Sequence, residues 1–418
     1  MRKEKNEKGI TLIALVITVI VLLILAGITI AALSRDNGIL TRSKEAKEKT
    51  KQAQKEEEKT LSNMENILGI YNFKNINTAD TNPEEAVPEN SIILEDDTNN
   101  GIVIKDKNDN EWVWIEVPKT TVFVDLTIDT TKELTEQNYT DIKNKLIEYA
   151  ATYREGKLGQ GRNWTDEWYE GCGLTSEEYT AIYQKMLKSI YSYGGFWIGR
   201  YEAGIEGSIE DISKARTEHT DIVIGTSPKA ISQKDAIPYN WVYCGEAQAL
   251  AKEMTPDSNY TSSLMFGIQW DLVCKFLEVK GGMATADINL KSTSWGNYNN
   301  ARIENITSGK YAIYNGSTLG EWNKISGSYT KQDSGNDCKT LLSTGISDYT
   351  KKMNIYDFAG NEWKWTLEHA TSYSSYPCAD RGGSSNNAGS SDPASERVSD
   401  ITTYNYENVG FRTTLYVN

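Results

Sequence analysis

The sequence of 418 residues contains only two histidines, His219 and His369, and five cysteines. The histidines lie far apart and neither belongs to a ligand motif, so we expect each to be solvated or structural. No two cysteines show the Cys-x-x-Cys spacing that structural zinc sites use. These counts argue strongly against histidine-rich iron or zinc catalysis, and we expect no metal and no cofactor.

The cysteines are too few and too scattered to define a disulfide framework. Their odd number leaves at least one free thiol. Cys244 and Cys274 occur in apolar or helical contexts, so we expect them to be buried thiols. Cys338 and Cys378 flank looser segments, and a disulfide between them remains open.

Basic residues are outnumbered, with 44 Lys and Arg against 58 Asp and Glu, which gives a net charge of −14. This balance argues against nucleic acid as a partner, because phosphate binding needs a basic face. It suits a soluble, self-repelling extracellular domain. The aromatic residues are mainly 11 Trp and 24 Tyr, with only 7 Phe. Trp and Tyr suit binding surfaces, but they serve equally well as core.

One long run has no charge at all, residues 10–34. As a helix it would extend about 36 Å, enough to cross a hydrocarbon core of about 30 Å. In lipid a helix is favoured because an isolated strand leaves its backbone unsatisfied. The basic residues before the run favour a cytoplasmic N-terminus, and they are Arg2, Lys3, Lys5 and Lys8. We expect a single-pass membrane protein with its C-terminal domain outside the cell.

The charged leader, residues 1–9, ends at Gly9, and the apolar run starts immediately at Ile10. A secretory signal peptide would have a shorter apolar stretch and a small-residue cleavage site. The segment "KGITLIALV" resembles the type IV prepilin leader, which implies cleavage after Gly9 and methylation of Ile10. Ile10 replaces the usual phenylalanine of that family, and Ala14 stands where it has a glutamate. The second departure puts packing as a major pilin in doubt, and leaves a minor, tip or pseudopilin-like subunit or a plain membrane anchor.

We predict that residues 35–70 form a helical stalk. The part between Lys44 and Thr60 would carry charged side chains on every face of the helix. A helix unbroken from Ile10 to Ile67 would span about 85 Å. A disordered charged linker is the alternative. Residues 71–91 are rich in Pro, Asn and acid, and we interpret them as a linker.

Residues 92–418 have the texture of a globular domain. The segment from Gly101 to Pro118 alternates on both sides of an Asn-rich turn and predicts a β-hairpin. Thr175 to Ser192 predicts an amphipathic helix that opens with a capping box and stops at Gly194-Gly195, followed by a short strand. Two further helices are expected at Glu246–Met254 and Ser263–Val279. This mixture predicts an α+β fold.

Seven motifs follow one another along this domain. They are "GGFWIGRYEAG", "PYNWVYCGEAQALA", "SSLMFGIQWDLVCKFL", "SWGNY", "MNIYDFAGNEWKWTLE", "RGGS" and "VGFR". Their order resembles the formylglycine-generating enzyme (sulfatase-modifying factor) family, over about Gly101 to Tyr416. The resemblance implies a C-type-lectin-like fold. Arg381, Arg397 and Arg412 are candidates for pairing with carboxylates or backbone carbonyls in a loop-rich core.

The oxidation chemistry of that family needs two cysteines just after the RGGS strand, where thiolates bind Cu(I). Residues 385–392 contain none, so we expect a non-catalytic member. The family also binds calcium, and Lys364 stands where it has a glutamate ligand. An ammonium group cannot coordinate Ca²⁺, so we expect Lys364 to take the place of the cation and pair with Asp357. A second calcium site elsewhere remains open.

The C-terminal segment is rich in Tyr, Ser, Asn and Asp, residues that antibody loops use for adaptable contacts. It resembles the variable proteins of diversity-generating retroelements, which share the lectin-like fold and diversify residues between RGGS and GFR. The resemblance implies a ligand-binding face. The residues expected on it are Tyr373, Tyr376, Ser385, Asn386, Asn387, Ser391, Glu396, Asp400, Tyr404 and Tyr406. Ordinary turn residues in a surface loop are the alternative.

The leading hypothesis is a surface-anchored, non-catalytic recognition protein, an adhesin or display protein, which includes a minor or tip pilin. Its expected partners are the membrane, an extracellular protein or glycan and, if the leader is cleaved, the pilus assembly machinery. The alternatives are a structural pilin-like filament subunit and a divergent formylglycine-generating oxidase.

Overall fold

The computed structural model describes residues 17–23, 47, 49–53, 76–154, 163–331, 339–372 and 374–418. The chain divides into two compact units, Met1–Ile67 and Leu68–Asn418. In the first unit the described residues are helical, and the apolar side chains within 17–23 are 47–67% exposed. Among the described residues we find no helix with the length and apolarity to cross a membrane. The predicted leader with Gly9 and Ile10, and most of the predicted membrane helix and stalk, lie outside the described residues.

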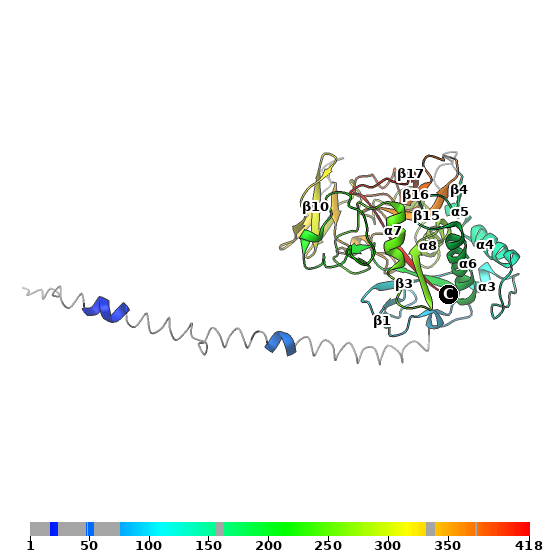
Figure 1. Ribbon diagram of the computed structural model, residues 1–418, viewed down its shortest axis with the longest axis horizontal. Helices are drawn as coiled ribbons and strands as arrows, with labels where there is room; N and C mark the ends of the chain where they lie inside the picture. The colour runs from blue at the N-terminus through cyan, green and yellow to red at the C-terminus, as the bar shows by residue number, and fades with distance from the viewer. Residues whose placement is uncertain are drawn as a thin grey trace, which may run out of the picture. The chain divides into compact units, whose positions relative to one another are not determined.

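A six-stranded sheet runs through the second unit (Figure 1). Its strands, in spatial order, are β1 (Ile92–Glu95), β2 (Val103–Lys105), β3 (Glu111–Glu116), β5 (Gly195–Gly199), β19 (Thr413–Val417) and β8 (Tyr260–Leu264). All neighbours are antiparallel. The β2–β3 pair, with Val103 opposite Val113, confirms the predicted hairpin. The last strand of the chain, β19, thus lies beside strands from its first half.

A second sheet carries three of the C-terminal motifs. Its strands are β17 (Arg397–Asp400), β16 (Cys378–Arg381), β15 (Trp363–Ala370) and β18 (Val409–Phe411), with β4 (Trp164–Thr165) also on β15. The β15–β18 pair is parallel and the others are antiparallel. The loops after β16 and β17 therefore start from paired, buried strands.

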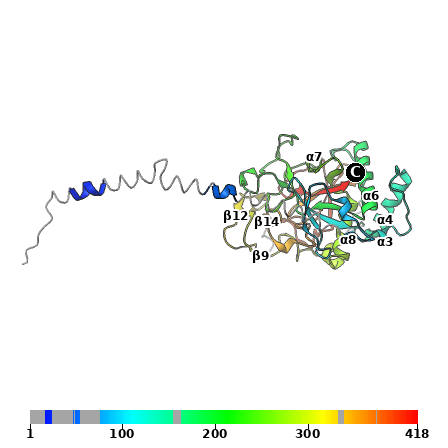
Figure 2. The same cartoon turned by 90° about the horizontal axis from the view of Figure 1, so that it is seen from below.

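Short strands build most of the region between residues 303 and 342. They are β9 (Ile303–Ile306), β10 (Lys310–Asn315), β11 (Thr318–Leu319), β12 (Asn323–Lys324), β13 (Tyr329–Lys331) and β14 (Thr340–Leu342), and earlier β6 (Gly204–Ile205) and β7 (Ala230–Ile231). β10 pairs with β11, β12 and β14, β9 with β13, and β6 with β7. The strands around β10 lie on the opposite side of this unit from helices α4 and α6 (Figures 1 and 2).

Helices cover the first sheet and connect it to the second. They are α3 (Lys119–Val122), α4 (Glu136–Tyr149), α5 (Ala151–Arg154), α6 (Ser176–Tyr193), α7 (Cys244–Lys252), α8 (Gly267–Val279) and α9 (Thr285–Asn289), with 3-10 turns η2 (Pro83–Ala86), η3 (Ile212–Lys214) and η4 (Asp348–Thr350). The capping box of Thr175 and Glu178 is confirmed at the start of α6, which ends at Gly194 with φ 71°. Separate helices and mostly antiparallel sheets confirm the α+β class.

One helix boundary was predicted wrongly. Ser263 does not begin a helix but lies in β8, where it pairs with Thr414 of β19. The helix begins four residues later, at Gly267. An apolar run that passes from a strand directly into a helix has no period change sharp enough to locate the junction.

The described part of the predicted linker, residues 76–91, packs against the globular unit. Asn82 donates its backbone N–H to the carbonyl of Tyr193 (2.7 Å). Trp197 donates its indole N–H to the carbonyl of Ala86 (2.6 Å), and Ala86 is buried. This segment therefore covers the junction between the end of α6 and the start of β5.

The core uses large aromatic residues and contains the cysteines. Trp112, Trp197, Trp270, Trp295 and Trp365 are all fully buried. The four described cysteines, Cys172, Cys244, Cys274 and Cys378, are buried free thiols, which confirms the expectation for Cys244 and Cys274. Cys338 lies outside the described residues. Burial raises the pKa of the Cys172 thiol to about 11.

Candidate functional site: an aromatic pocket

A pocket of about 610 Å³ lies where four separate segments meet. The segment after η3 contributes Arg216, the segment before α7 contributes Trp241, and the β11–β12 connection contributes Trp322. The β17–β18 loop contributes Tyr406 and Glu407. This volume lies within the range of small-ligand pockets, about 300–1,000 Å³.

A line of stacked rings connects the pocket to the core. The Trp241 and Tyr406 rings stack with centroids 6.2 Å apart, and Tyr404 lies 4.7 Å from Tyr406. Tyr404 in turn meets the fully buried Trp365 edge-on at 6.1 Å. Tyr406 is 48% exposed, whereas Trp241 and Tyr404 are half-buried, so an exposed ring is held in place by rings that are less exposed. Such a rigid aromatic surface binds a partner at low cost in side-chain entropy.

The backbone at Trp241 is held in an unusual conformation. Its φ is +57°, a left-handed value that is an outlier for a bulky side chain. Two pocket residues hold it there. The N–H of Trp241 donates to the carbonyl of Tyr406 (3.2 Å), and its carbonyl accepts from Nη2 of Arg216 (2.9 Å). Strain of this kind persists only where the surroundings enforce it, and it clusters at functional sites.

Buried charges stabilise the strands from which the pocket loops emerge. Arg381 pairs with Asp271 (2.8 Å) and Glu368 (2.9 Å), and Arg397 pairs with the same two carboxylates. Arg154 contacts Asp271, Glu368 and Asp166 at 3.0–3.2 Å. These contacts join β15, β16 and β17 to α5 and α8, and they confirm the expected pairing of Arg381 and Arg397.

Lys364 and Arg412 lie in a second group of buried charges. The Arg412 guanidinium donates to the carbonyls of Gly199 and Tyr356, which confirms that part of the prediction. Lys364 is fully buried, donates to the carbonyl of Gly360 and lies 3.4 Å from a carboxylate oxygen of Glu202.

The expected ion pair between Lys364 and Asp357 is wrong. Asp357 accepts instead from the N–H of Gly345 (2.7 Å) and the hydroxyl of Thr350 (2.8 Å). Its carboxylate is thereby oriented by its own neighbourhood, and Glu202 becomes the partner of Lys364. The absence of calcium at this site stays a prediction.

The structure brings some of the expected ligand residues to the pocket. Tyr406 lines it, and Tyr404 is half-buried beneath Tyr406. The loop after β16 adjoins this region, because Asn408 donates to the hydroxyl of Ser384 (3.3 Å). In that loop Ser385 is buried and Asn386 is half-buried.

Other expected ligand residues lie elsewhere or point inward. Asn387 is half-buried and accepts from the N–H of Ser384 (3.1 Å), which closes its own turn. Glu396 is buried, whereas Ser391 is exposed. Asp400 is half-buried and pairs across the sheet with Cys378, close in sequence to the exposed Tyr376. Tyr373 lies outside the described residues.

Sequence reasoning missed Arg216, Trp241 and Trp322. Trp241 falls inside the motif "PYNWVYCGEAQALA", in which we expected no ligand-binding residue, and the other two belong to no motif. Only the fold brings these side chains to Tyr406. A tryptophan flanked by polar residues was the single available signal, and the composition of this chain makes that signal weak.

No protein-family model matches the chain, and no curated protein matches it. Among solved structures, one titled "Crystal Structure of CarF" is 13% identical, with 54% of this chain and 87% of that chain covered and a TM-score of 0.32. Treponema denticola variable protein 1 is 14% identical, with 54% and 85% covered and a TM-score of 0.28. At TM-scores this low neither likeness carries an argument. The α+β class rests on the helices and sheets themselves.

Proposed function

We propose that this chain is a non-catalytic recognition protein and that its aromatic pocket binds an external ligand, a protein side chain or a glycan. The pocket carries the proposal, because it combines three aromatic residues with charged groups that can accept or donate hydrogen bonds. Flat rings supply contact area, and a few polar groups fix the orientation of a ligand. The acidic and basic side chains on its lining are those of Arg216, Glu321 and Glu407.

The chemistry of the lining supports binding rather than catalysis. The described residues that line the pocket include neither cysteine nor histidine. Glu407, the buried carboxyl of the lining, has a pKa raised by burial. Its neighbour Asn240 donates to the carbonyl of Glu407 (2.8 Å), which fixes the backbone of the pocket loop. This arrangement supplies a rigid receptor surface and no paired nucleophile and base.

The finer parts of the proposal rest on the sequence. The order of the seven motifs supports a C-type-lectin-like arrangement, and the uncharged run 10–34 supports a membrane anchor with a cytoplasmic N-terminus. The exposed apolar side chains of residues 17–23 agree with an anchor. If a peptidase removes the leader, the protein is a minor or tip pilin. Mass spectrometry of the mature N-terminus tests this: an N-methylated Ile10 supports processing, and an intact Met1 contradicts it.

Two tyrosines of nearly equal exposure allow a matched test. Tyr406 is 48% exposed and lines the pocket, whereas Tyr376 is 47% exposed and does not line it. The full-length chain, in mild detergent, is screened against a glycan array and a peptide library. We expect Tyr406→Ala to reduce binding of the retained ligand at least tenfold, about 1.4 kcal/mol, and Tyr376→Ala to leave it within about twofold.

Equal binding by wild type and Tyr406→Ala would contradict the pocket assignment. Loss through Tyr376→Ala alone would move the binding face to the β15–β16 connection. If the protein forms an aldehyde on a cysteine-containing peptide in the presence of copper, the recognition hypothesis is rejected in favour of the oxidase alternative. Unchanged near-UV circular dichroism of both variants is the control for folding.

A further inference from the structure

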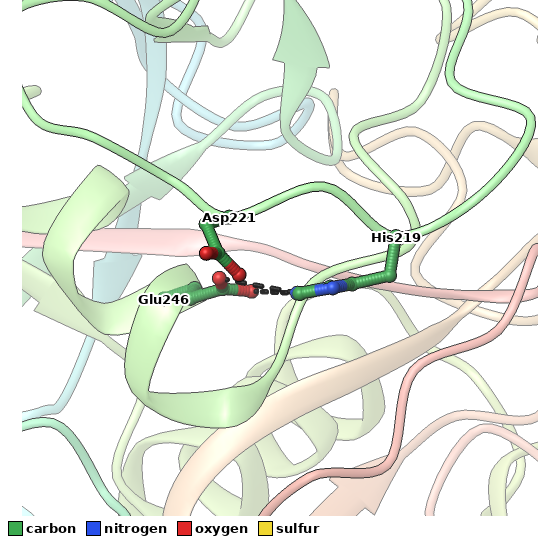
Figure 3. Close-up of side chains that lie close together, drawn as sticks. All are labelled: His219, Asp221 and Glu246. Carbon is green, nitrogen blue, oxygen red and sulfur yellow. Dashed lines mark hydrogen bonds and ion pairs between the residues drawn. The ribbon is translucent and has the colours of Figure 1, made fainter.

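A second group of side chains lies next to the pocket loops. His219 and Asp221 come from the segment after η3, and both face Glu246 in the first turn of α7 (Figure 3). The ligand atoms of the three side chains all lie within 4.8 Å of one another. His219 Nε2 is 3.2 Å and 3.1 Å from the two oxygens of Glu246. No local motif links His219 to Glu246, because the two residues are 27 positions apart in the chain.

The separation between His219 and Glu246 matches one edge of a tetrahedral metal coordination shell. Zinc binds imidazole nitrogen at about 2.0–2.1 Å and carboxylate oxygen at about 2.0–2.2 Å, usually in a tetrahedron. Two atoms each about 2.1 Å from one tetrahedral ion are about 3.4 Å apart. The His219–Glu246 separation is close to that value, so an ion requires little movement of either side chain.

The first-turn carboxylate is already oriented. One oxygen of Glu246 accepts from the N–H of Tyr243 (2.9 Å), and the other accepts from the N–H of Ile222 (3.1 Å). The His219 ring stacks on the Tyr243 ring, with centroids 4.1 Å apart and planes 26° apart. In protein metal sites, such contacts to the ligating residues fix the orientation of the ligands and raise the affinity for the metal.

The negative charge of the two carboxylates also favours the binding of a cation. Asp221 and Glu246 bring two carboxylates together, which repel each other. Within the described part of the chain no lysine or arginine forms an ion pair with either of them. His219 and Glu246 are 17% and 16% exposed, and Asp221 is exposed. An ion therefore has access from solvent to a site that is largely shielded.

We propose that His219, Asp221 and Glu246 bind a divalent transition-metal ion of the Zn²⁺ type, with a fourth position open to water. A nitrogen and two carboxylates suit zinc and its neighbours in the first transition row. Calcium and magnesium prefer shells made of oxygen alone. The imidazole nitrogen therefore favours a transition-metal ion over calcium or magnesium.

Such an ion would fasten the segment of residues 216–222 to α7. Arg216, at one end of that segment, donates to the carbonyl of Thr220 (2.7 Å) and to that of Trp241 (2.9 Å). Arg216 and Thr217, at the start of that segment, line the wall of the aromatic pocket. The ion would therefore hold the pocket wall in place, and this second consequence, unlike metal binding itself, rests on the proposed function.

The test measures binding of the metal alone to the metal-free full-length chain. Calorimetric titration with Zn²⁺ is expected to show one site, and Co²⁺ is expected to give the intense visible absorption of a four-coordinate ion. His219→Ala and Asp221→Asn should each weaken Zn²⁺ binding by at least about tenfold, the lower end of what even an outer contact contributes. Glu246 is left intact because it also caps α7.

The control is His369→Gln, since His369 is the only other histidine in the chain. It should bind Zn²⁺ as the wild type does. Zinc binding that survives both His219→Ala and Asp221→Asn would overturn the proposal, as would calcium binding of equal strength that the His219 variant retains. Pocket ligand binding is measured separately, so its failure leaves a positive zinc result standing.

Discussion

The buried charge network beneath the pocket loops contains three arginines and three carboxylates: Arg154, Arg381, Arg397, Asp166, Asp271 and Glu368. Glu368 is fully buried and contacts all three arginines. Glu368→Gln keeps the shape of this side chain but leaves one buried guanidinium without a counter-charge. Breaking a buried ion pair from one side costs about 3–5 kcal/mol. We expect a loss of that size in the free energy of unfolding, from a total of about 5–15 kcal/mol.

The same network predicts how stability depends on pH. Burial opposes ionisation of Glu368, but Arg397, Arg381 and Arg154 outweigh it and lower its pKa from 4.5 to about 2. Because the folded state holds this proton less tightly than the unfolded state, the stabilisation is complete above about pH 4.5 and disappears as the pH falls towards 2. A change of this size corresponds to about 3 kcal/mol, and Glu368→Gln should lack this part of the acid destabilisation.

Urea unfolding followed by tryptophan fluorescence measures both effects. All 11 tryptophans lie at or beyond residue 112, so the signal reports on the globular unit alone. Glu304→Gln is the matched control, because Glu304 pairs with Arg302 at 2.7 Å on the surface, where both are more than half exposed. Exposed pairs contribute about 0–1 kcal/mol. A cost below about 1 kcal/mol for Glu368→Gln, or an acid dependence equal to that of the wild type, would refute the reasoning.

Two further predictions concern a buried carboxyl and a glycine. Burial, against the attraction of Lys364, raises the pKa of Glu202 from 4.5 to about 7; the folded state therefore holds the proton more tightly, and stability falls by about 3 kcal/mol as the pH rises from about 4.5 to 7. Glu202→Gln should remove this fall, as measured by urea unfolding across that range. Gly383 has φ +72°, and a Cβ there would overlap the carbonyl of Asp392. Gly383→Ala should lower the free energy of unfolding by about 3 kcal/mol or more.

Each of these predictions has its own check. For Glu202, a variant whose stability declines with pH as steeply as the wild type contradicts the assigned pKa. For Gly383, the control is Gly225→Ala, since Gly225 has φ +83° but nothing within 4 Å of the added Cβ. That control should cost only the left-handed backbone energy, about 1–2 kcal/mol. Equal losses for the two alanine variants would show that the close approach to Asp392 contributes nothing.

Elements whose determinants are local could be predicted from the sequence. The hairpin of β2 and β3 follows from alternation around a turn, and the limits of α6 follow from the Thr175 cap and Gly194. The short strands around β10 could not be predicted, because two or three residues carry no measurable period. Their strand character comes from partners far away in sequence, as in the pairing of Tyr311 with Leu342.

The candidate site was predictable only in its C-terminal half. Tyr406 was expected on a ligand face because its segment is rich in tyrosine and small polar residues. The same composition also suggested Ser385 and Glu396, which the structure buries. Amino-acid composition does not indicate whether a side chain points to solvent or into the core. The chain turns inward after the two glycines that follow Arg381. Trp241 was missed because its position in the pocket depends on its left-handed backbone conformation, which no sequence pattern indicates.

The buried thiols leave the surface of the described unit without cysteine chemistry. Cys172, Cys244, Cys274 and Cys378 are all buried, and burial holds the pKa of Cys274 well above its usual range. The thiolate is the nucleophile in alkylation, so these four side chains resist labelling at neutral pH. With Cys338 replaced by serine, a cysteine introduced at the exposed Thr403, in the same loop as Tyr406 but not on the pocket lining, becomes a unique attachment point for a fluorophore. The pocket rim can then be followed by fluorescence anisotropy as a partner arrives.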